Sequence, residues 1–311
     1  MRKNMKTNRY SIVEMKSILA VCILTISFFS ATACLKGQQP DSDNLTTKDT
    51  IKVLAIGNSF SQDALESYLS ELARAADIPV VIGNLLIGGA SLALHWDNAN
   101  HDKAAYSYRK IGADGRNQYR DSVSIAEALS DQDWDFVSFQ QVSHDAGRFE
   151  TLVEPLPLLF AYVRRHLQGK KVKFIFHQTW AYAQDATHEG FKNYDRDQLK
   201  MYRAIVEVSK SIKELIPVDI IVPTGTAIQN GRTSMIGDNF CRDGFHLDVN
   251  IGRYTAAATW FESLFGESVM GNSFKPAALS THEAEIAKQA AHVAVLKPYA
   301  ITDFSTGHPI P

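Results

Sequence analysis

Five short apolar runs, separated by segments with helical periodicity, dominate the pattern of hydrophobic and polar positions along the chain. Several runs are apolar at consecutive positions, which is typical of strands covered by helices on both faces. The predicted strands are residues 51–57, 79–86, 134–140, 172–177 and 218–223. Because strands and helical segments alternate, the pattern predicts a parallel sheet.

The segments between these runs place apolar residues three and four positions apart, on one face of a helix. Ser280 and Glu283 have the spacing of a capping box at the start of the last such segment. The predicted helices are residues 64–76, 155–167, 197–216, 254–265 and 283–295. We therefore predict an α/β fold, a doubly wound three-layer α/β/α sandwich on a five-stranded parallel, flavodoxin-like sheet. In such folds, ligands bind beyond the carboxyl ends of the strands.

Residues 95–125 interrupt the alternation of strands and helices. They are polar and aromatic, and too numerous for a plain connection. Gly112 and Gly115 predict the turn of a small hairpin within them. We expect an insertion in a single domain, residues 50–311, placed where it would roof the ligand site.

The amino terminus carries an apolar, uncharged run, residues 17–33, that follows several basic residues. This run is too short and wrongly flanked for an ordinary membrane span and is typical of an export signal. Ala31 and Ala33 before Cys34 resemble the lipobox of bacterial lipoproteins. The resemblance implies removal of residues 1–33 and lipidation of Cys34; the alternative is a plain secretory signal with a chance cysteine.

Composition and charge narrow the class of protein. The chain has 311 residues, 45% hydrophobic and 21% charged, which excludes disorder. Removing residues 1–33 takes away five basic residues and one acidic residue, so the net charge falls from −2 to −6. No basic run follows, and we expect no nucleic-acid partner. Polar residues 34–49 predict a flexible tether to a lipid anchor in the bacterial cell envelope, at the periplasmic or surface face of the outer membrane.

The cysteines and histidines predict neither disulfide nor metal. Cys22 lies in the predicted signal and Cys34 would carry lipid, so Cys241 alone remains and cannot form an internal disulfide. The sequence contains no HExxH, Cys-x-x-Cys or calcium-loop spacing. We therefore expect no metal site and no cofactor.

Two short motifs suggest chemistry. Ser59 directly follows the first predicted strand, at the start of a helix, where a hydroxyl suits a nucleophile, although such serines are more often helix caps. Asp243 and His246, near the end of the fold, are spaced so that one turn presents both side chains, with the carboxylate holding one ring nitrogen. Alone, that pair reads equally well as a capping aspartate and a surface histidine. Together, the motifs predict that Ser59, His246 and Asp243 meet at one rim.

At these residues the sequence resembles the SGNH (GDSL-like) hydrolase superfamily, and more closely a bacterial lipoprotein branch known as a domain of unknown function. The resemblance covers residues 51–268. Gly57-Asn58-Ser59 matches the block that carries the nucleophile, and Asp243 with His246 matches the block that carries acid and base. Asn58 replaces an aspartate that is not a reacting group. The resemblance implies the SGNH hydrolase fold and a carboxylic ester hydrolase.

The resemblance also implies an oxyanion hole. Its expected backbone donors are Ser59 and Gly89, with Gly88 close behind, because a glycine leaves room for the oxyanion. The family's next block, Gly-x-Asn-Asp, is altered here, and a direct overlay puts His144 at the asparagine and Val142 at the glycine. We favour the amide of Gln140 or Gln141 as the replacement donor. His144 then becomes a candidate substrate contact.

Loops after the predicted strands supply further candidate substrate contacts. Mixed aromatic faces and polar donors suit a sugar or another polyhydroxylated carrier. The candidates are Asn58, His144, Trp180, Tyr182 and Arg232. The alternatives are packing for the aromatic residues and a salt bridge to Asp238 for Arg232.

We expect a serine esterase that removes acetyl or other short acyl groups from a carbohydrate, by analogy with the family. Its partners would be a glycan or small-molecule ester, and a membrane only through the lipid anchor. Activity should rise with the titration of an imidazole, at about pH 6 to 7 for an unperturbed ring. The alternatives are a non-catalytic glycan-binding lipoprotein on the same fold, and a lipase or thioesterase.

Overall fold

The computed structural model describes residues 49–305, and through them runs a seven-stranded sheet in the order β4-β3-β2-β1-β5-β6-β7. β1, β2, β5, β6 and β7 are parallel, whereas β3 and β4 form an antiparallel hairpin beyond β2. The strands are β1 (Ile51–Gly57), β2 (Val80–Leu86), β3 (Tyr106–Ile111), β4 (Asn117–Val123), β5 (Phe136–Phe139), β6 (Lys173–His177) and β7 (Ile220–Val222). The predicted signal peptide, Cys34 and nearly all of the predicted tether lie outside the described residues.

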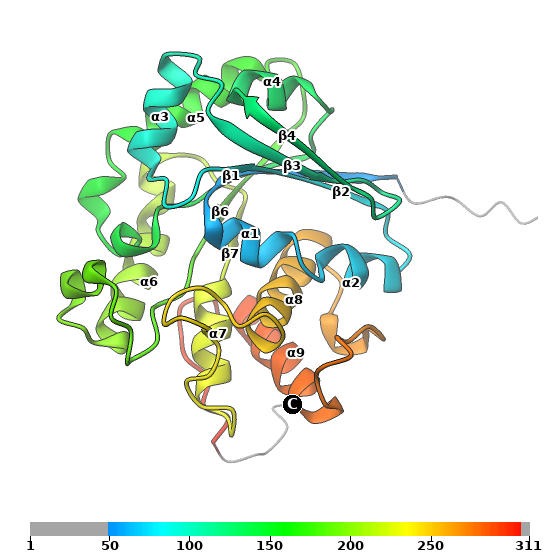
Figure 1. The fold of residues 1–311 in the computed structure, drawn as a ribbon, viewed down its shortest axis with the longest axis vertical. Helices are drawn as coiled ribbons and strands as arrows, with labels where there is room; N and C mark the ends of the chain where they lie inside the picture. The colour runs from blue at the N-terminus through cyan, green and yellow to red at the C-terminus, as the bar shows by residue number, and fades with distance from the viewer. Residues whose placement is uncertain (1–48, 306–311) are drawn as a thin grey trace, which may run out of the picture. The chain divides into compact units, whose positions relative to one another are not determined.

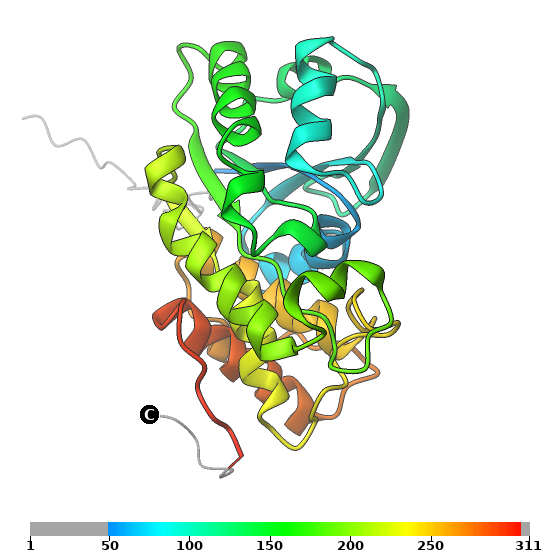
Figure 2. The ribbon, with the colours of Figure 1, turned by 90° about the vertical axis from the view of Figure 1, so that its left-hand side faces the viewer.

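Helices cover both faces of the sheet (Figures 1 and 2), as the continuous apolar strands predict. β1 shows why, because Val53 and Ala55 enter one hydrophobic core and Leu54 and Ile56 enter the other. The helices are α1 (Ser59–Leu65), α2 (Leu69–Ala75), α3 (Leu92–Asn100), α4 (Ile125–Ser130), α5 (Pro155–His166), α6 (Gln198–Leu215), α7 (Thr224–Arg232), α8 (Ile251–Phe265) and α9 (Thr281–Leu296), with short 3-10 turns η1 (Ser143–Asp145), η2 (Phe149–Thr151), η3 (Glu189–Tyr194) and η4 (Val269–Gly271). The predicted α/β class is confirmed, but the sheet has seven strands instead of the predicted five, because the insertion adds the antiparallel pair β3–β4 to the five parallel strands.

Two segments differ from their predicted form. The helix predicted at 64–76 is two helices, because Tyr68 between them is left-handed (φ 68°) and its hydroxyl donates to the Val249 carbonyl, 3.0 Å away. The segment expected as a substrate loop after the last strand is the buried helix α7. It lies so close to the end of β6 that a Cβ on Gly225 would stand 2.2 Å from the Thr179 carbonyl oxygen.

The insertion contains the predicted hairpin, and the turn of this hairpin lies away from the candidate site. Its turn closes where Gly115 N–H donates to the Gly112 carbonyl at 2.8 Å. Ile111 pairs with Ile82, so the turn lies beside Ile78 and Pro79, next to the start of β2. That is the amino edge of the parallel strands, opposite the edge where Ser59 follows β1. The hairpin widens the sheet, and its turn does not roof the site.

Within residues 49–305, no helix combines the length and the apolar character needed to cross a bilayer.

Candidate active site

Ser59 lies on a tight turn from strand to helix. β1 ends at Gly57, and a Cβ there would stand 2.3 Å from the Ser61 hydroxyl, so glycine fits where other residues would not. Asn58 caps α1, since its side-chain oxygen accepts from Phe60 N–H at 3.0 Å. Ser59 is the first residue of α1, and its own N–H is therefore not used by the helix. Its side chain is partly exposed.

The structure brings Ser59, His246 and Asp243 into one hydrogen-bonded row. Ser59 Oγ lies 2.9 Å from His246 Nε2, and His246 Nδ1 lies 2.7 Å from Asp243 Oδ2. The other carboxylate oxygen accepts from the N–H groups of His246 (2.7 Å) and Phe245 (3.1 Å). Because a carboxylate accepts, the imidazole proton sits on Nδ1 and Nε2 is free to accept the serine proton.

The electrostatics of Asp243 favour the ionised form. Burial raises the pKa of its carboxyl, but the hydrogen bonds from the His246 ring and from the N–H groups of His246 and Phe245 outweigh burial and lower this pKa below its usual value. Asp243 is therefore a carboxylate near neutral pH, able to orient the imidazole and to stabilise it when charged.

Trp180 lies beneath this row and touches the neighbours of both reacting residues. Its ring stacks on Phe60 with centroids 4.1 Å apart, and its Nε1–H donates to the Phe245 carbonyl at 2.7 Å. Phe245 in turn packs on the His246 ring. Trp180 is fully buried. The expectation that it contacts substrate is therefore wrong, and its role is to support the turn that carries His246.

The Asn58 side chain is likewise hydrogen-bonded within the protein. Besides capping α1, its amide donates to the Ala90 carbonyl at 2.9 Å and accepts from Gln140 Nε2 at 2.8 Å. It is buried, so it does not contact substrate as expected. Through Ala90 it holds the glycine loop beside the nucleophile. In that loop Gly88 and Gly89 are exposed, Gly89 is left-handed (φ 68°), and a Cβ at either position would have no atom within 4 Å.

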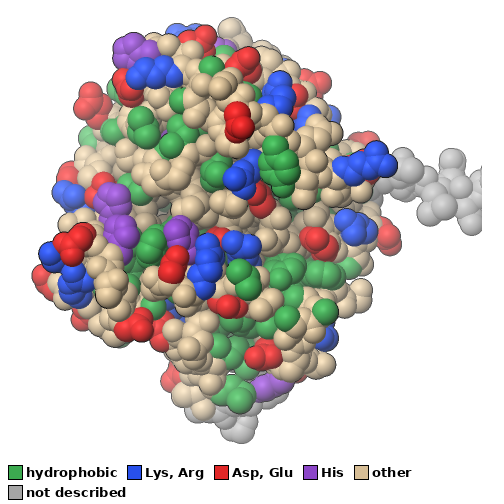
Figure 3. Space-filling model, in the orientation of Figure 1, with side chains coloured by type: hydrophobic (Ala, Val, Ile, Leu, Met, Phe, Trp, Pro, Cys, Tyr) green, Lys and Arg blue, Asp and Glu red, His purple; other side chains and the backbone are tan. Residues whose placement is uncertain are grey.

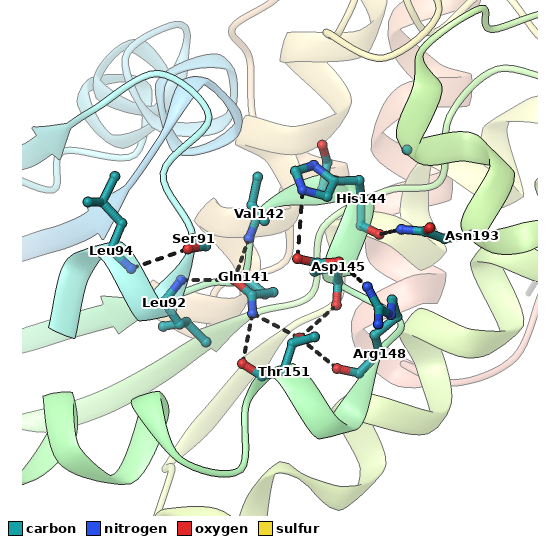
Figure 4. Close-up of polar contacts among 12 residues, drawn as sticks. Ser91, Leu92, Leu94, Gln141, Val142, His144, Asp145, Arg148, Thr151 and Asn193 are labelled. Carbon is teal, nitrogen blue, oxygen red and sulfur yellow. Dashed lines mark hydrogen bonds and ion pairs between the residues drawn. The ribbon is translucent and has the colours of Figure 1, made fainter. Parts of the chain in front are cut away.

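Both glutamine amides are used inside the protein, contrary to the expected oxyanion role. Gln141 accepts from the N–H groups of Leu92 and Val142, each at 2.9 Å, and donates to Thr151 (Figure 4). Gln140 donates to Asn58 and accepts from a ring nitrogen of His177. Each glutamine is 2% exposed. They join loops to one another because the ends of β5, β1 and β2 are neighbours in the sheet.

Gln140 belongs to a buried hydrogen-bonded row along the carboxyl edge of the sheet, which the sequence did not reveal. Gln140 Oε1 can only accept, so His177 Nδ1 donates to it at 3.0 Å, and His177 Nε2 accepts from the Thr224 hydroxyl at 3.0 Å. Burial lowers the pKa of His177 to about 3, so the ring is neutral. The row Thr224–His177–Gln140–Asn58–Ala90 follows β7, β6, β5, β1 and β2 in their spatial order. The one signal in sequence is a polar residue at or within two positions of the end of four of these strands, namely Asn58, Gln140, His177 and Thr224.

Histidines form one side of the rim. His144 stacks on His188 with ring centroids 5.9 Å apart, and His188 lies edge-on to Phe245. Figure 3 shows histidine side chains exposed on this face, in the region between α1 and α6. Gly190 N–H donates to His188 Nδ1 at 3.0 Å, which leaves the proton on Nε2. Burial lowers the pKa of His188 most, and electrostatic repulsion from the nearby His144 and His246 lowers it further. His144 lies on the rim of the site, and its contact with substrate stays a prediction. The sequence analysis did not identify His188 as a residue of this rim.

Tyr182 and Arg232 lie in the interior, so the expectation that they contact substrate is also wrong. The Tyr182 hydroxyl bonds to Ser143 Oγ at 2.8 Å, and the side chain is fully buried. Arg232 pairs with Asp238, its Nε 2.7 Å from a carboxylate oxygen, and donates to the Ala181 carbonyl. Tyr182 instead packs in the interior, and Arg232 forms the salt bridge to Asp238, as the alternative interpretations of these two residues predict.

Metal ligands do not gather in the described part of the chain. Between residues 49 and 305, no three His, Cys, Asp or Glu side chains lie together as a metal site would need. The row of Ser59, His246 and Asp243 is instead suited to acyl transfer, in which the protein's own groups move the proton.

Comparisons with known proteins agree with the fold. A family model described as "Domain of unknown function (DUF4886)" matches residues 52–294. A crystal structure of a DUF4886 family protein from Bacteroides uniformis is 49% identical, covers 82% of this chain and 98% of its own, and has a TM-score of 0.81. The crystal structure of TesA is 10% identical, covers 68% of this chain and 97% of its own, and has a TM-score of 0.44. The search of curated proteins found no match.

Proposed function

The chain belongs to the DUF4886 family, and we propose that it is a serine esterase that hydrolyses short-chain acyl esters of a carbohydrate. The observation that carries this proposal is the hydrogen-bonded row Ser59–His246–Asp243. Ser59 Oγ lies 2.9 Å from His246 Nε2, and His246 Nδ1 lies 2.7 Å from Asp243 Oδ2. The motifs Gly57-Asn58-Ser59 and Asp243-x-x-His246, which resemble those of SGNH hydrolases, support it.

In the first half of the reaction, the Ser59 proton passes to His246 Nε2 as Ser59 Oγ bonds to the ester carbonyl carbon. The carbonyl oxygen becomes an oxyanion, and the N–H groups of Ser59 and Gly89 are the donors proposed for it. When the intermediate collapses, the bond to the leaving alcohol breaks and His246 gives that oxygen its proton. An acyl-serine remains, and Asp243 has stabilised the imidazolium throughout.

In the second half, water attacks the acyl-serine carbonyl and gives a proton to His246 Nε2. The new tetrahedral intermediate expels Ser59 Oγ, which recovers the proton from His246, and the carboxylic acid leaves. No redox step and no external cofactor enter this scheme. Gln140 and Gln141 take no part in it, because their amides are bonded within the protein.

The carbohydrate part of the proposal rests on the family resemblance and on the side chains beside His246. Phe245, His188 and His144 offer an aromatic face and ring N–H donors, which suit the apolar faces and hydroxyls of a sugar. We also propose export and lipidation at Cys34, which the motif at residues 31–34 supports. The enzyme would then act on glycans at the cell envelope.

Hydrolysis of p-nitrophenyl acetate, butyrate and octanoate tests the proposal. We expect release of p-nitrophenol by the wild type, fastest with acetate, and its loss in Ser59→Ala by at least about 10³-fold. Ser70→Ala is the matched control, a partly exposed serine on α2 whose hydroxyl bonds to Glu71. Equal rates for Ser59→Ala and wild type would contradict the proposal. No hydrolysis with retained glycan binding would favour the non-catalytic alternative, and preference for octanoate would favour a lipase or thioesterase.

A further inference from the structure

One buried carboxylate connects the helix that carries Ser59 to the turn that carries His246. Asp63 lies on α1, four residues after Ser59 and hence on the same helix face. Its side chain is 2% exposed. Asp63 Oδ2 accepts the N–H of Leu247, the residue after His246, at 2.9 Å. The two partners are 184 positions apart in sequence, so this contact is made by the tertiary fold alone.

Two arginines complete the environment of Asp63. Arg253, on α8, donates Nε to Oδ1 at 2.8 Å and brings a terminal nitrogen to 2.6 Å. Arg242, the residue before Asp243, brings Nη1 to 3.1 Å from Oδ2 and also donates to the Leu247 carbonyl. A buried carboxylate with two guanidinium partners and a backbone donor is fully satisfied, which holds it in one geometry.

The same contacts hold both ends of the turn formed by residues 243–246, which carries Asp243 and His246. Arg242 precedes Asp243 and Leu247 follows His246, and the backbone N–H of Arg242 donates to the His246 carbonyl at 2.9 Å. Both Arg242 and Leu247 bind the one Asp63 carboxylate. The turn between them is therefore fixed relative to α1, and with it the separation of Ser59 Oγ from His246 Nε2.

We propose that Asp63, through Leu247 and Arg242, is the positioning residue that sets the distance between the Ser59 nucleophile and the His246 base. It contacts neither reacting atom and acts through the backbone that carries His246. The inference rests on the proposed esterase function. Because a shift of about 1 Å in a reacting group can lower a rate about 10²-fold, loosening this contact should lower kcat far more than it alters substrate binding.

The test compares Asp63→Asn with Glu262→Gln in the full chain. Glu262 is a matched control, a buried carboxylate on α8 that also accepts a backbone N–H (Val269, 2.9 Å) and lies 2.6 Å from a ring nitrogen of His292. With p-nitrophenyl acetate, we expect Asp63→Asn to lower kcat about 10- to 100-fold with KM within about threefold. Glu262→Gln should keep the wild-type kcat. A folded Asp63→Asn protein with wild-type kcat, or an equal loss in Glu262→Gln, would overturn the proposal.

A second measurement does not need activity. Amide hydrogen exchange across residues 242–248 should be faster in Asp63→Asn than in wild type and unchanged in Glu262→Gln. Unchanged exchange in Asp63→Asn would overturn the positioning role even if the wild type proves inactive, in which case the esterase proposal fails separately. If Asp63→Asn does not fold, Arg242→Gln replaces it. A several-fold lower kcat with faster exchange would support the proposal, and wild-type values of both would overturn it.

Discussion

Two segments near Ser59 contain similar residue types and use them in opposite ways. In residues 243–246, Asp243 bonds to His246 and His246 bonds to Ser59, and the side chains of Asp243 and His246 are 42% and 21% exposed. In residues 177–182, His177, Trp180 and Tyr182 are fully buried, and each has a polar partner inside the protein. Aromatic and imidazole side chains at the edge of a sheet can thus react with a ligand only where they are exposed. Those that are buried and hydrogen-bonded inside the protein cannot.

The two segments are nevertheless joined by hydrogen bonds. The buried segment fixes the exposed one, since Trp180 holds the Phe245 carbonyl and Ala183 N–H donates to the Gly244 carbonyl at 2.8 Å. Changes in 243–246 should therefore affect the reaction first, and changes in 177–182 should affect stability first. The predictions below separate the two.

The largest effect is expected at Asp243. Asp243→Asn keeps the shape but places an amide against His246 Nδ1, which favours the wrong tautomer, and kcat should fall about 10⁴-fold. Asp248→Asn is the control in the same loop, where the side chain accepts from the N–H groups of Asn250 and Ile251. Steady-state hydrolysis of p-nitrophenyl acetate measures both. A loss below tenfold in Asp243→Asn would show that the carboxylate does not orient the base.

Trp180 should show the opposite pattern. Trp180→Ala removes a fully buried indole and should destabilise the fold by about 3–5 kcal/mol in urea unfolding. Trp180→Phe keeps much of the stacking on Phe60 and should leave KM unchanged. If Trp180→Phe instead raised KM strongly at wild-type stability, the indole would be a substrate contact and the comparison would be wrong.

Acid should destabilise the buried row through His177. Burial lowers the pKa of His177 to about 3, so the unfolded chain binds a proton below about pH 6.5 that the native protein does not. The free energy of unfolding should therefore fall by about 1.4 kcal/mol per pH unit for this group as the pH drops from about 6 to 4. His177→Gln should remove that part of the slope and also lower kcat.

His95 provides the control for His177. It is buried on α3 against the Tyr106 hydroxyl, and burial lowers its pKa to about 3 as well. His95→Gln should flatten the pH dependence of stability by the same amount while leaving kcat unchanged. Urea unfolding at several pH values measures both slopes, and an unaltered slope in His177→Gln would argue against a neutral buried ring.

The smallest effect is expected in the glycine loop. Gly89 is left-handed, so Gly89→Ala should cost about 1–2 kcal/mol of stability and lower kcat by shifting the proposed oxyanion donor. Gly266→Ala is the matched control, because Gly266 is also left-handed (φ 68°), a Cβ there has no atom within 4 Å, and it caps α8 away from the site. Equal kcat for both variants would remove Gly89 from the oxyanion hole.

The sequence predicted the architecture and the meeting of Ser59, His246 and Asp243 better than it predicted the surroundings of the other candidate residues. Apolar runs predicted all five parallel strands, since Val53 and Leu54 must each enter a core on opposite faces. The capping box at Ser280 and the hairpin turn at Gly115 depend on local geometry, and both are present. The order of the strands, in contrast, is set by tertiary packing.

That order decides which polar residues find partners. Asn58 and Gln140 are 82 positions apart, and Gln140 and His177 are 37 apart, but the strands they follow are neighbours. A single sequence shows polar residues near the ends of these strands without showing that these residues bond to one another. For the same reason it assigned Gln140 to the oxyanion hole and Trp180 to the substrate, and it gave no sign of Asp63.

Labelling with a fluorophosphonate probe, followed by peptide mapping, tests most directly whether His246 activates the Ser59 hydroxyl. The account predicts covalent modification of the intact chain at Ser59, none in Ser59→Ala, and labelling slowed at least about 10³-fold in His246→Ala. Modification at a different serine, or equally fast labelling of wild type and His246→Ala, would contradict it.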